Sequence, residues 1–176
     1  VIERRVGIPI SLSVIYLAVA QRINFPMVGS GMPGHFLIRP DFEDAGIFVD
    51  SFNRGEILFK QDCQKRLSRM YQQTIELDPD WLAPVSNRHI LARMLNNLKF
   101  IYLHNQKIDK ALATMSGIIK LFPRNATEIR DRGKLYYQVN RRQEAAVDLE
   151  NILKIAPNNE DTATIQLLLD KINQVS

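Results

Sequence analysis

One stretch of the chain is written twice, as YLHNQKIDKALATMSGIIKLFP at residues 102–123 and as YYQVNRRQEAAVDLENILKIAP at residues 136–157. The two copies are offset by 34 residues, and equivalent positions carry identical or similar side chains. The matched pairs are Tyr102 and Tyr136, Ala111 and Ala145, Met115 and Leu149, Ile118 and Ile152, and Pro123 and Pro157. In each copy a polar turn follows the tyrosine, and a proline, which lacks the amide hydrogen that a helix needs, ends the next helical stretch. The repeat therefore predicts two consecutive helical hairpins.

This pattern resembles the tetratricopeptide repeat, in which a Leu-Gly pair precedes the tyrosine, an alanine opens the second helix and a proline ends it. The first copy has Leu98 but carries Lys99 in place of the glycine. The second copy has Gly133 but carries Arg132 in place of the leucine. Small residues let the two helices of a hairpin approach closely, which agrees with the resemblance. The alternative is a chance match in an irregular helical bundle.

Further helices are expected on both sides of the repeats. Residues 160–175 carry apolar side chains at helical spacing, and we expect a helix there that covers the open end of the stack. Residues 84–92 are expected to form a helix that supports the first repeat. Together these segments predict an all-α tetratricopeptide array of helical hairpins.

The first eighty residues follow a different pattern. We expect one helix over residues 11–22, followed by short strands over residues 27–30, 35–39 and 47–50. Glycine and proline residues separate these strands and indicate turns. One helix followed by a small antiparallel sheet is an α+β arrangement. The sequence Asp78-Pro79-Asp80 indicates a boundary, so we divide the chain into domains at residues 1–80 and 81–176.

Two residues of the α+β part suggest a site. His35 lies in PGHFLIR at the head of a predicted strand, and Asp50 ends the next strand in FVDSFN. The order of helix, strand and strand resembles papain-like and transglutaminase-like folds, in which these elements present a cysteine, a histidine and an aspartate. The resemblance implies that the histidine activates the thiol and that the aspartate orients the imidazole. Here the expected helix start reads GIPISLS without a cysteine, and Cys63 follows later in a polar stretch.

Three motifs and the repeats together resemble the SirB-type family of bacterial proteins, which join a transglutaminase-like domain to tetratricopeptide repeats. The motifs read RxGxPISL, PGHF and VDxFNxG, and the resemblance covers nearly the whole chain. The matching residues are Arg5, Gly7, Pro9, Ser11, Leu12, Pro33 to Phe36, Asp50, Phe52, Asn53 and Gly55. The resemblance implies a bacterial, cytoplasmic protein, and one branch of the family carries an invasion-regulator label.

We call His35, Asp50 and Ser11 the remnant site, and each of these residues also has a structural interpretation. His35 can hold two strands together through a bond to Asp50. Ser11 can replace the cysteine as the nucleophile, or it can cap the helix by accepting a bond from a free backbone N–H. The absent cysteine favours a protein-interaction or regulatory factor without catalysis. The retained His35 and Asp50 favour the alternative, a hydrolase or acyl-transferase that uses Ser11 or a residue of a missing N-terminal part.

The repeats predict a second site. Tetratricopeptide arrays bind peptides on the concave face formed by the first helix of each repeat. Helical spacing and the 34-residue offset place six residues on this face, namely Arg93, Asn96, Phe100, Arg130, Lys134 and Tyr137. The three cations would form a basic groove, and we expect an acidic or C-terminal peptide as its ligand because arginine can bind a carboxylate through two hydrogen bonds. The alternative is a set of ordinary solvated charges.

Composition limits the remaining possibilities. The 176 residues are 45% hydrophobic and 24% charged, which is typical of a folded soluble protein. A single cysteine cannot form an internal disulfide and favours a reducing compartment, which agrees with the bacterial cytoplasm that the resemblance implies. No apolar run reaches the ~18 residues of a membrane span, so no membrane partner is expected. The chain begins VIERR without a methionine, and we expect that an N-terminal part has been removed.

Nucleic-acid, metal and cofactor ligands are not expected. The chain has a net charge of +4, and residues 81–176 carry 14 basic and 9 acidic groups, but this basic excess is modest and no nucleic-acid-binding motif accompanies it. His89 and His104 lack Cys or His partners at ligand spacing, so no metal site is predicted. No cofactor is predicted either.

Overall fold

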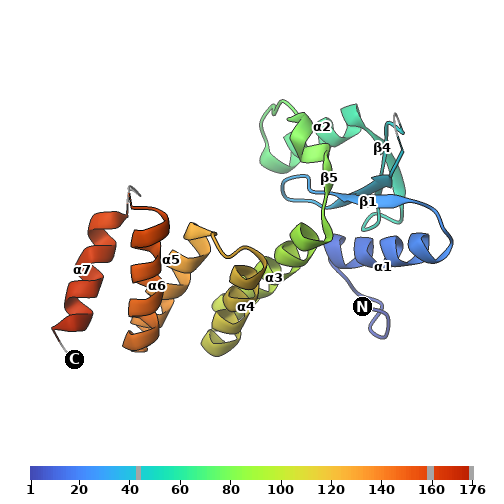
Figure 1. Ribbon diagram of the computed structural model, residues 1–176. Helices are drawn as coiled ribbons and strands as arrows, with labels where there is room; N and C mark the ends of the chain where they lie inside the picture. The colour runs from blue at the N-terminus through green and yellow to red at the C-terminus, as the bar shows by residue number, and fades with distance from the viewer. Residues whose placement is uncertain (43–44, 158–160, 175–176) are drawn as a thin grey trace. The chain divides into compact units, whose positions relative to one another are not determined.

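The computed structural model describes residues 1–42, 45–157 and 161–174. The chain divides into two compact units, residues 1–91 and 92–176. The first unit is a sheet with helices and the second is a set of helical hairpins (Figure 1). The predicted α+β part followed by an all-α array is therefore confirmed.

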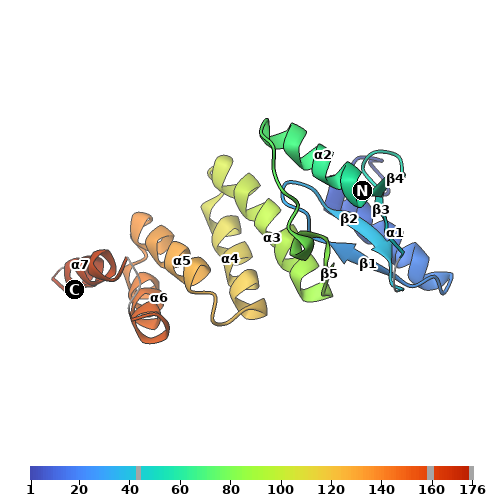
Figure 2. The ribbon, with the colours of Figure 1, turned by 90° about the horizontal axis from the view of Figure 1, so that it is seen from above.

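The first unit is built on a five-stranded antiparallel sheet with the strand order β4-β3-β2-β1-β5. Figure 2, turned by 90° from Figure 1, shows α1 running along this sheet, and Figure 1 shows α2 on the opposite face. The elements are α1 (Pro9–Arg22), β1 (Met27–Ser30), β2 (Leu37–Pro40), β3 (Ile47–Asp50), β4 (Glu56–Phe59), α2 (Lys60–Tyr71), η1 (Pro79–Leu82) and β5 (Pro84–Val85).

A single apolar cluster holds the sheet against α2. Its buried members are Met32, Leu37, Phe48, Leu58, Cys63, Leu67, Leu77 and Leu82, with Ile75 and Trp81 packed against them. Residues of neighbouring strands meet in register, so that Phe48 lies opposite Leu58 on the face that α2 covers. Each such side chain contributes about 1.5–3 kcal/mol when it is removed from water.

The turn before β2 requires a glycine. Gly34 has a φ of +70°, which side chains other than glycine rarely adopt, and a Cβ atom there would lie 2.3 Å from the Met70 sulfur. The backbone N–H of His35 donates to the Met32 carbonyl over 3.1 Å and closes this turn. His35 therefore precedes β2, whereas the sequence predicted that it opens the strand.

The second unit consists of helices that pack in antiparallel pairs. These are α3 (Asn87–His104), which begins in the first unit, α4 (Ile108–Leu121), α5 (Ala126–Gln138), α6 (Arg142–Ile155) and α7 (Thr162–Asn173). The core between α5, α6 and α7 contains Ile129, Ala145, Leu149, Ile152, Ile165, Leu169 and Ile172. The predicted closing helix is present as α7, and the predicted ends at residues 160 and 175 lie outside the described residues.

Several predicted boundaries are wrong for local reasons. Helix α1 begins at Pro9, two residues before the predicted start, because proline suits the first helical position. The predicted helix over residues 84–92 is instead β5 followed by the start of α3, because Pro84 and Val85 pair with β1. Strand β4 and helix α2 were absent from the prediction.

Candidate functional site

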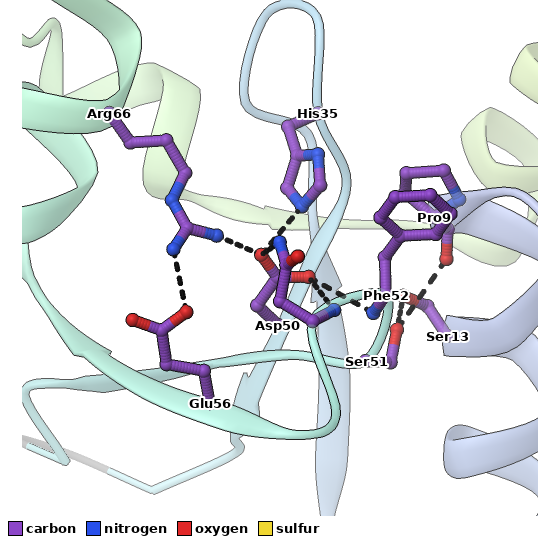
Figure 3. Close-up of polar contacts among 9 residues, drawn as sticks. Pro9, Ser13, His35, Asp50, Ser51, Phe52, Glu56 and Arg66 are labelled. Atoms are coloured by element: carbon purple, nitrogen blue, oxygen red, sulfur yellow. Dashed lines mark hydrogen bonds and ion pairs between the residues drawn. The ribbon is translucent and has the colours of Figure 1, made fainter. Parts of the chain in front are cut away.

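The first candidate site lies where β2 begins and β3 ends. Ile38 pairs with Val49 in the antiparallel ladder, which brings the turn carrying His35 next to Asp50, the last residue of β3. The His35 Nε2 atom lies 2.9 Å from Asp50 Oδ2, and the two side chains are 9% and 0% exposed. Figure 3 shows the imidazole pointing at this carboxylate. The two residues thus meet as their motifs predict, while a catalytic role for them stays a prediction.

The Asp50 carboxylate is the centre of a larger network. Its Oδ1 accepts hydrogen bonds from the backbone N–H groups of Phe52 (3.0 Å) and Asn53 (3.1 Å). Its Oδ2 accepts a bond from the Asn53 side-chain amide over 2.7 Å and forms an ion pair with Arg66. The ring of Phe52 stands edge-on to the His35 ring, with 6.3 Å between the ring centres. Asp50 is therefore held by groups of Phe52, Asn53, Arg66 and His35.

These contacts keep the carboxylate ionised. Burial raises the pKa of Asp50, but the hydrogen bonds from Asn53 and His35 lower it by more in total. The resulting pKa lies below the ordinary value of 3.8. At neutral pH the site therefore contains a buried negative charge that His35 and Arg66 face.

Arg66 was not predicted from the sequence. Its Nη2 also donates to Glu56 over 2.7 Å, so one guanidinium joins α2 to the ends of β3 and β4 (Figure 3). Arg66 shares one face of α2 with the buried Cys63 and Leu67, which turns its side chain toward the sheet. No local feature of the sequence indicates its carboxylate partners.

The start of α1 lies on the other side of this network. Pro9 occupies the first helical position, and its carbonyl accepts a 3.5 Å bond from the Ser51 hydroxyl. Ser51 also bonds the buried Ser13 hydroxyl over 2.7 Å. Neither serine was singled out from the sequence, and both fasten α1 to the strand end next to Asp50 (Figure 3).

Ser11 has a local structural task. Its hydroxyl donates to the Ile8 carbonyl over 3.0 Å and accepts from the Ile8 N–H over 3.0 Å. Ser11 therefore caps the helix from its third residue, whereas the sequence interpretation made Ser11 the capping residue at the helix start. The hydroxyl hydrogen is thereby directed at a backbone oxygen.

Cys63 is a core residue of the first unit. It lies on α2 with its side chain fully buried in the apolar cluster. Burial raises the pKa of its thiol to about 11, so the thiolate is scarce at neutral pH.

The second candidate site lies on α5. Arg130 Nη1 and Lys134 Nζ both reach the Asp161 carboxylate, over 2.6 Å and 3.5 Å respectively. Arg130 also donates to Asp131 from Nε (3.0 Å) and from Nη2 (2.9 Å). These bonds, the one to Asp131 first, raise the pKa of Arg130 above its ordinary value. The predicted neighbours Arg130 and Lys134 are thus brought together on one helix face.

The other predicted groove residues lie on two helices. Arg93, Asn96 and Phe100 belong to α3, where Phe100 is 67% exposed and Arg93 and Asn96 are half-buried. Tyr137 lies on α5 and packs partly against the core between α5, α6 and α7. Their role in binding stays a prediction.

The two departures from the repeat pattern are ion pairs in the interior of the array. Lys99 replaces the pattern's glycine and binds Glu128 of α5 over 2.6 Å. Arg132 replaces the leucine and donates to both oxygens of Asp148 over 2.7 Å, and also to Ser116 over 2.8 Å. These charges therefore fix the packing of neighbouring helices and are not available to a ligand.

No group of three or more His, Cys, Asp or Glu side chains in residues 1–42, 45–157 and 161–174 is arranged to hold a metal ion. No helix among the same residues is long and apolar enough to cross a membrane.

Comparisons with known proteins agree with this architecture. The transglutaminase-like superfamily matches residues 1–96, and the tetratricopeptide repeat matches residues 98–170. The chain therefore belongs to the transglutaminase-like superfamily and carries tetratricopeptide repeats after that domain.

The predicted order of a transglutaminase-like domain followed by tetratricopeptide repeats is confirmed, and the curated relatives of the chain are named UPF0162 proteins. A UPF0162 protein of Xylella fastidiosa is 34% identical over 169 residues, which are 94% of this chain and 60% of that protein. A UPF0162 protein of Vibrio cholerae is 30% identical over 177 residues. The matched region is 100% of this chain and 64% of that protein. The UPF0162 protein YchA of Escherichia coli is 25% identical, with 98% and 64% covered. The chain thus spans about three fifths of the length of these relatives.

Proposed function

We propose that this chain is a protein-interaction factor of the bacterial cytoplasm that binds acidic peptide segments through its repeats. The observation that carries the proposal is that Arg130 and Lys134 both form ion pairs with the Asp161 carboxylate. Two cations four residues apart on one helix face suit a carboxylate ligand. Tetratricopeptide arrays generally bind peptides on the face to which these first helices belong.

Phe100 supports the same surface. It is two-thirds exposed on α3, the first helix of the preceding hairpin. An exposed aromatic ring provides apolar contact area for a peptide whose acidic groups the cations of α5 bind. We therefore assign the acidic side chains of the ligand to α5 and its apolar side chains to α3.

In this proposal the transglutaminase-like unit acts without a thiol nucleophile. Cys63, the one cysteine of the chain, is buried with a raised pKa. The start of α1 is occupied by Pro9 and by Ser11, whose hydroxyl caps the helix. The Asp50 carboxylate is shared between His35 and the Arg66 guanidinium, so it is not reserved for the imidazole.

The test is affinity capture with the full chain as bait, followed by titration of the partner that is identified. Reversing Arg130 and Lys134 to Glu is expected to weaken binding by roughly 1–3 kcal/mol, the range of charge-assisted contacts. The matched control reverses the exposed Lys120 and Lys154 on α4 and α6, and we expect it to leave the affinity unchanged. Equal affinity of all three proteins at low salt would place the binding surface elsewhere.

A second candidate function is a hydrolase or acyl-transferase. It is favoured by the 2.9 Å approach of His35 to Asp50, a geometry in which the carboxylate orients the imidazole. Turnover of p-nitrophenyl acetate that His35→Ala abolishes would support it. Turnover that is absent, or equal in the variant, would leave this pair a structural link.

A further inference from the structure

We infer that Asp161 is an internal competitor for the peptide site on α5, so that a ligand binds there by exchanging its own carboxylate for that of Asp161. This inference rests on the proposed function and adds to it the mode of ligand entry. It makes Asp161 a residue that sets the affinity of the groove.

The repeat register places Asp161 on the binding face. It follows Thr127 by the same 34 residues that separate Thr127 from Arg93, and it stands immediately before the first residue of α7. Because α7 is the next first helix of the array, this carboxylate occupies the same position in its repeat that Arg93 occupies in the first copy. A ligand that lies across the first helices therefore meets Asp161 beside Arg130 and Lys134.

The charges of this cluster cancel while Asp161 is bound. Arg130 and Lys134 carry two positive charges, and Asp131 and Asp161 carry two negative ones. Asp131 adjoins Arg130 on the same helix and moves with it, whereas Asp161 approaches from α7. Displacing Asp161 therefore exposes one net positive charge, which is the charge that an acidic ligand requires.

The exposure of the groups permits this exchange. The Arg130, Lys134 and Asp161 side chains are 23%, 31% and 31% exposed, so water and a peptide can reach them. An ion pair at this degree of exposure contributes up to ~1 kcal/mol, which a second carboxylate can replace. While Asp161 occupies the cations, a peptide cannot bind them. The apparent affinity for the peptide is therefore reduced in proportion to the fraction of molecules in which the site is free.

The experiment measures binding of a fluorescein-labelled octaglutamate peptide by anisotropy at low salt. Asp161→Asn removes the charge but keeps a side chain suited to a helix start, and we expect it to tighten binding by roughly three- to tenfold. Asp161→Thr, which copies the equivalent residue Thr127 of α5, is a second variant with the same expected gain. The matched control is Asp170→Asn, which removes the same charge further along α7, where Asp170 accepts a bond from Gln166. It is expected to leave the affinity unchanged, and circular dichroism checks that α7 stays folded.

A double variant, Arg130→Gln with Lys134→Gln, separates the possible outcomes. Tighter binding by both Asp161 variants that the double variant abolishes supports the inference. Equal binding by wild type and both Asp161 variants, with loss in the double variant, overturns the inference and leaves the proposed function standing. Equal gains in affinity from Asp161→Asn and Asp170→Asn would show that the gain comes from the change in net charge alone, which also overturns the inference. Binding that the double variant does not weaken, or no binding by any variant, overturns both the inference and the proposed binding of acidic peptides on α5.

Discussion

Each unit of this chain contains a carboxylate that two basic side chains approach, Asp50 in the first unit and Asp161 in the second, and these two carboxylates differ chiefly in burial. Asp50 is 0% exposed and faces His35, Arg66 and the Asn53 amide. Asp161 is 31% exposed and faces Arg130 and Lys134. We therefore call the Asp50 cluster closed, because its carboxylate is buried, and the Asp161 cluster open, because its carboxylate is partly exposed to water.

The difference in burial decides what each cluster can do. A buried charge that loses its partner keeps its desolvation cost, so such pairs are expensive to break. An exposed pair regains water when it opens, and it is worth ~0–1 kcal/mol. The Asp50 cluster is thus suited to fastening strands and α2 together, and the Asp161 cluster is suited to exchange with a ligand.

The largest expected effect is that of Asp50→Ala, which leaves His35 and Arg66 without their shared carboxylate. We expect a loss of about 3–5 kcal/mol in the free energy of unfolding of the first unit. Trp81 is the one tryptophan of the chain and packs against that unit's core, so its fluorescence during urea denaturation reports the loss. The matched variant Asp161→Ala should cost ~1 kcal/mol or less, measured by circular dichroism. Equal losses in the two variants would contradict the distinction between the closed and the open cluster.

Cys63 provides the next test of how closed the first unit is. Because the pKa of its thiol is raised to about 11, reaction with a disulfide reagent at pH 8 should be roughly 100-fold slower than in the denatured chain. The rate should rise about tenfold per pH unit below this pKa. Rapid labelling of the native protein at pH 7 would show a reactive thiol and would reopen the enzymatic interpretation.

Close packing in the second unit predicts an effect of intermediate size. A Cβ atom at Gly133 would lie 3.1 Å from the Asp148 Cβ and 3.2 Å from a Leu149 methyl group. We expect Gly133→Ala to destabilise the array by about 1–3 kcal/mol, since the Asp148 Cβ is fixed to the α6 backbone. In the control Gly117→Ala the nearest atom, at 3.2 Å, is the end of the Leu95 side chain. That end can move, and alanine favours the helix, so this change should be near neutral. Thermal melting by circular dichroism measures both.

Acid should weaken the first unit in a defined pH range. The folded-state pKa of Asp50 lies below its ordinary value of 3.8, so its ionised form stabilises the fold. This contribution is complete above about pH 5 and is lost as the pH falls through the folded pKa. The stability difference between wild type and Asp50→Asn, followed by Trp81 fluorescence, should therefore shrink from pH 5 downwards. A constant difference down to pH 3 would remove Asp50 as the cause.

The fold was largely predictable because its signals are local or periodic. Strands β1 and β3 were predicted at their observed ends, 27–30 and 47–50, since turn residues bound both apolar runs. The hairpins followed from the 34-residue offset. Helix α2 was missed because only Cys63 and Leu67 of its residues are buried, and the packing of these two against the sheet is not a local signal.

The sites were predictable only in part. His35 and Asp50 were found through motifs, and Arg130 and Lys134 through helical spacing. Arg66 and Asp161 were missed because each acts through a partner that lies 16 or 31 residues away in the sequence. Such pairs form where tertiary packing brings two elements together, which spacing within one helix does not indicate.

The smallest expected effect concerns Ser11 and bears on the alternative enzyme. Loss of its two bonds to Ile8 should cost α1 about 0.5–1 kcal/mol, the usual size of a helix cap. The comparison is Ser13→Ala, which leaves the buried Ser51 hydroxyl without its 2.7 Å partner and should cost more, about 1–3 kcal/mol. Urea denaturation followed by Trp81 fluorescence ranks the two variants, and p-nitrophenyl acetate turnover is measured in parallel. Because the Ser11 hydrogen is directed at a backbone carbonyl, any turnover should survive Ser11→Ala unchanged. Turnover lost in Ser11→Ala but retained in Ser13→Ala, with α1 still folded, would instead make Ser11 the nucleophile and the first unit a catalytic one.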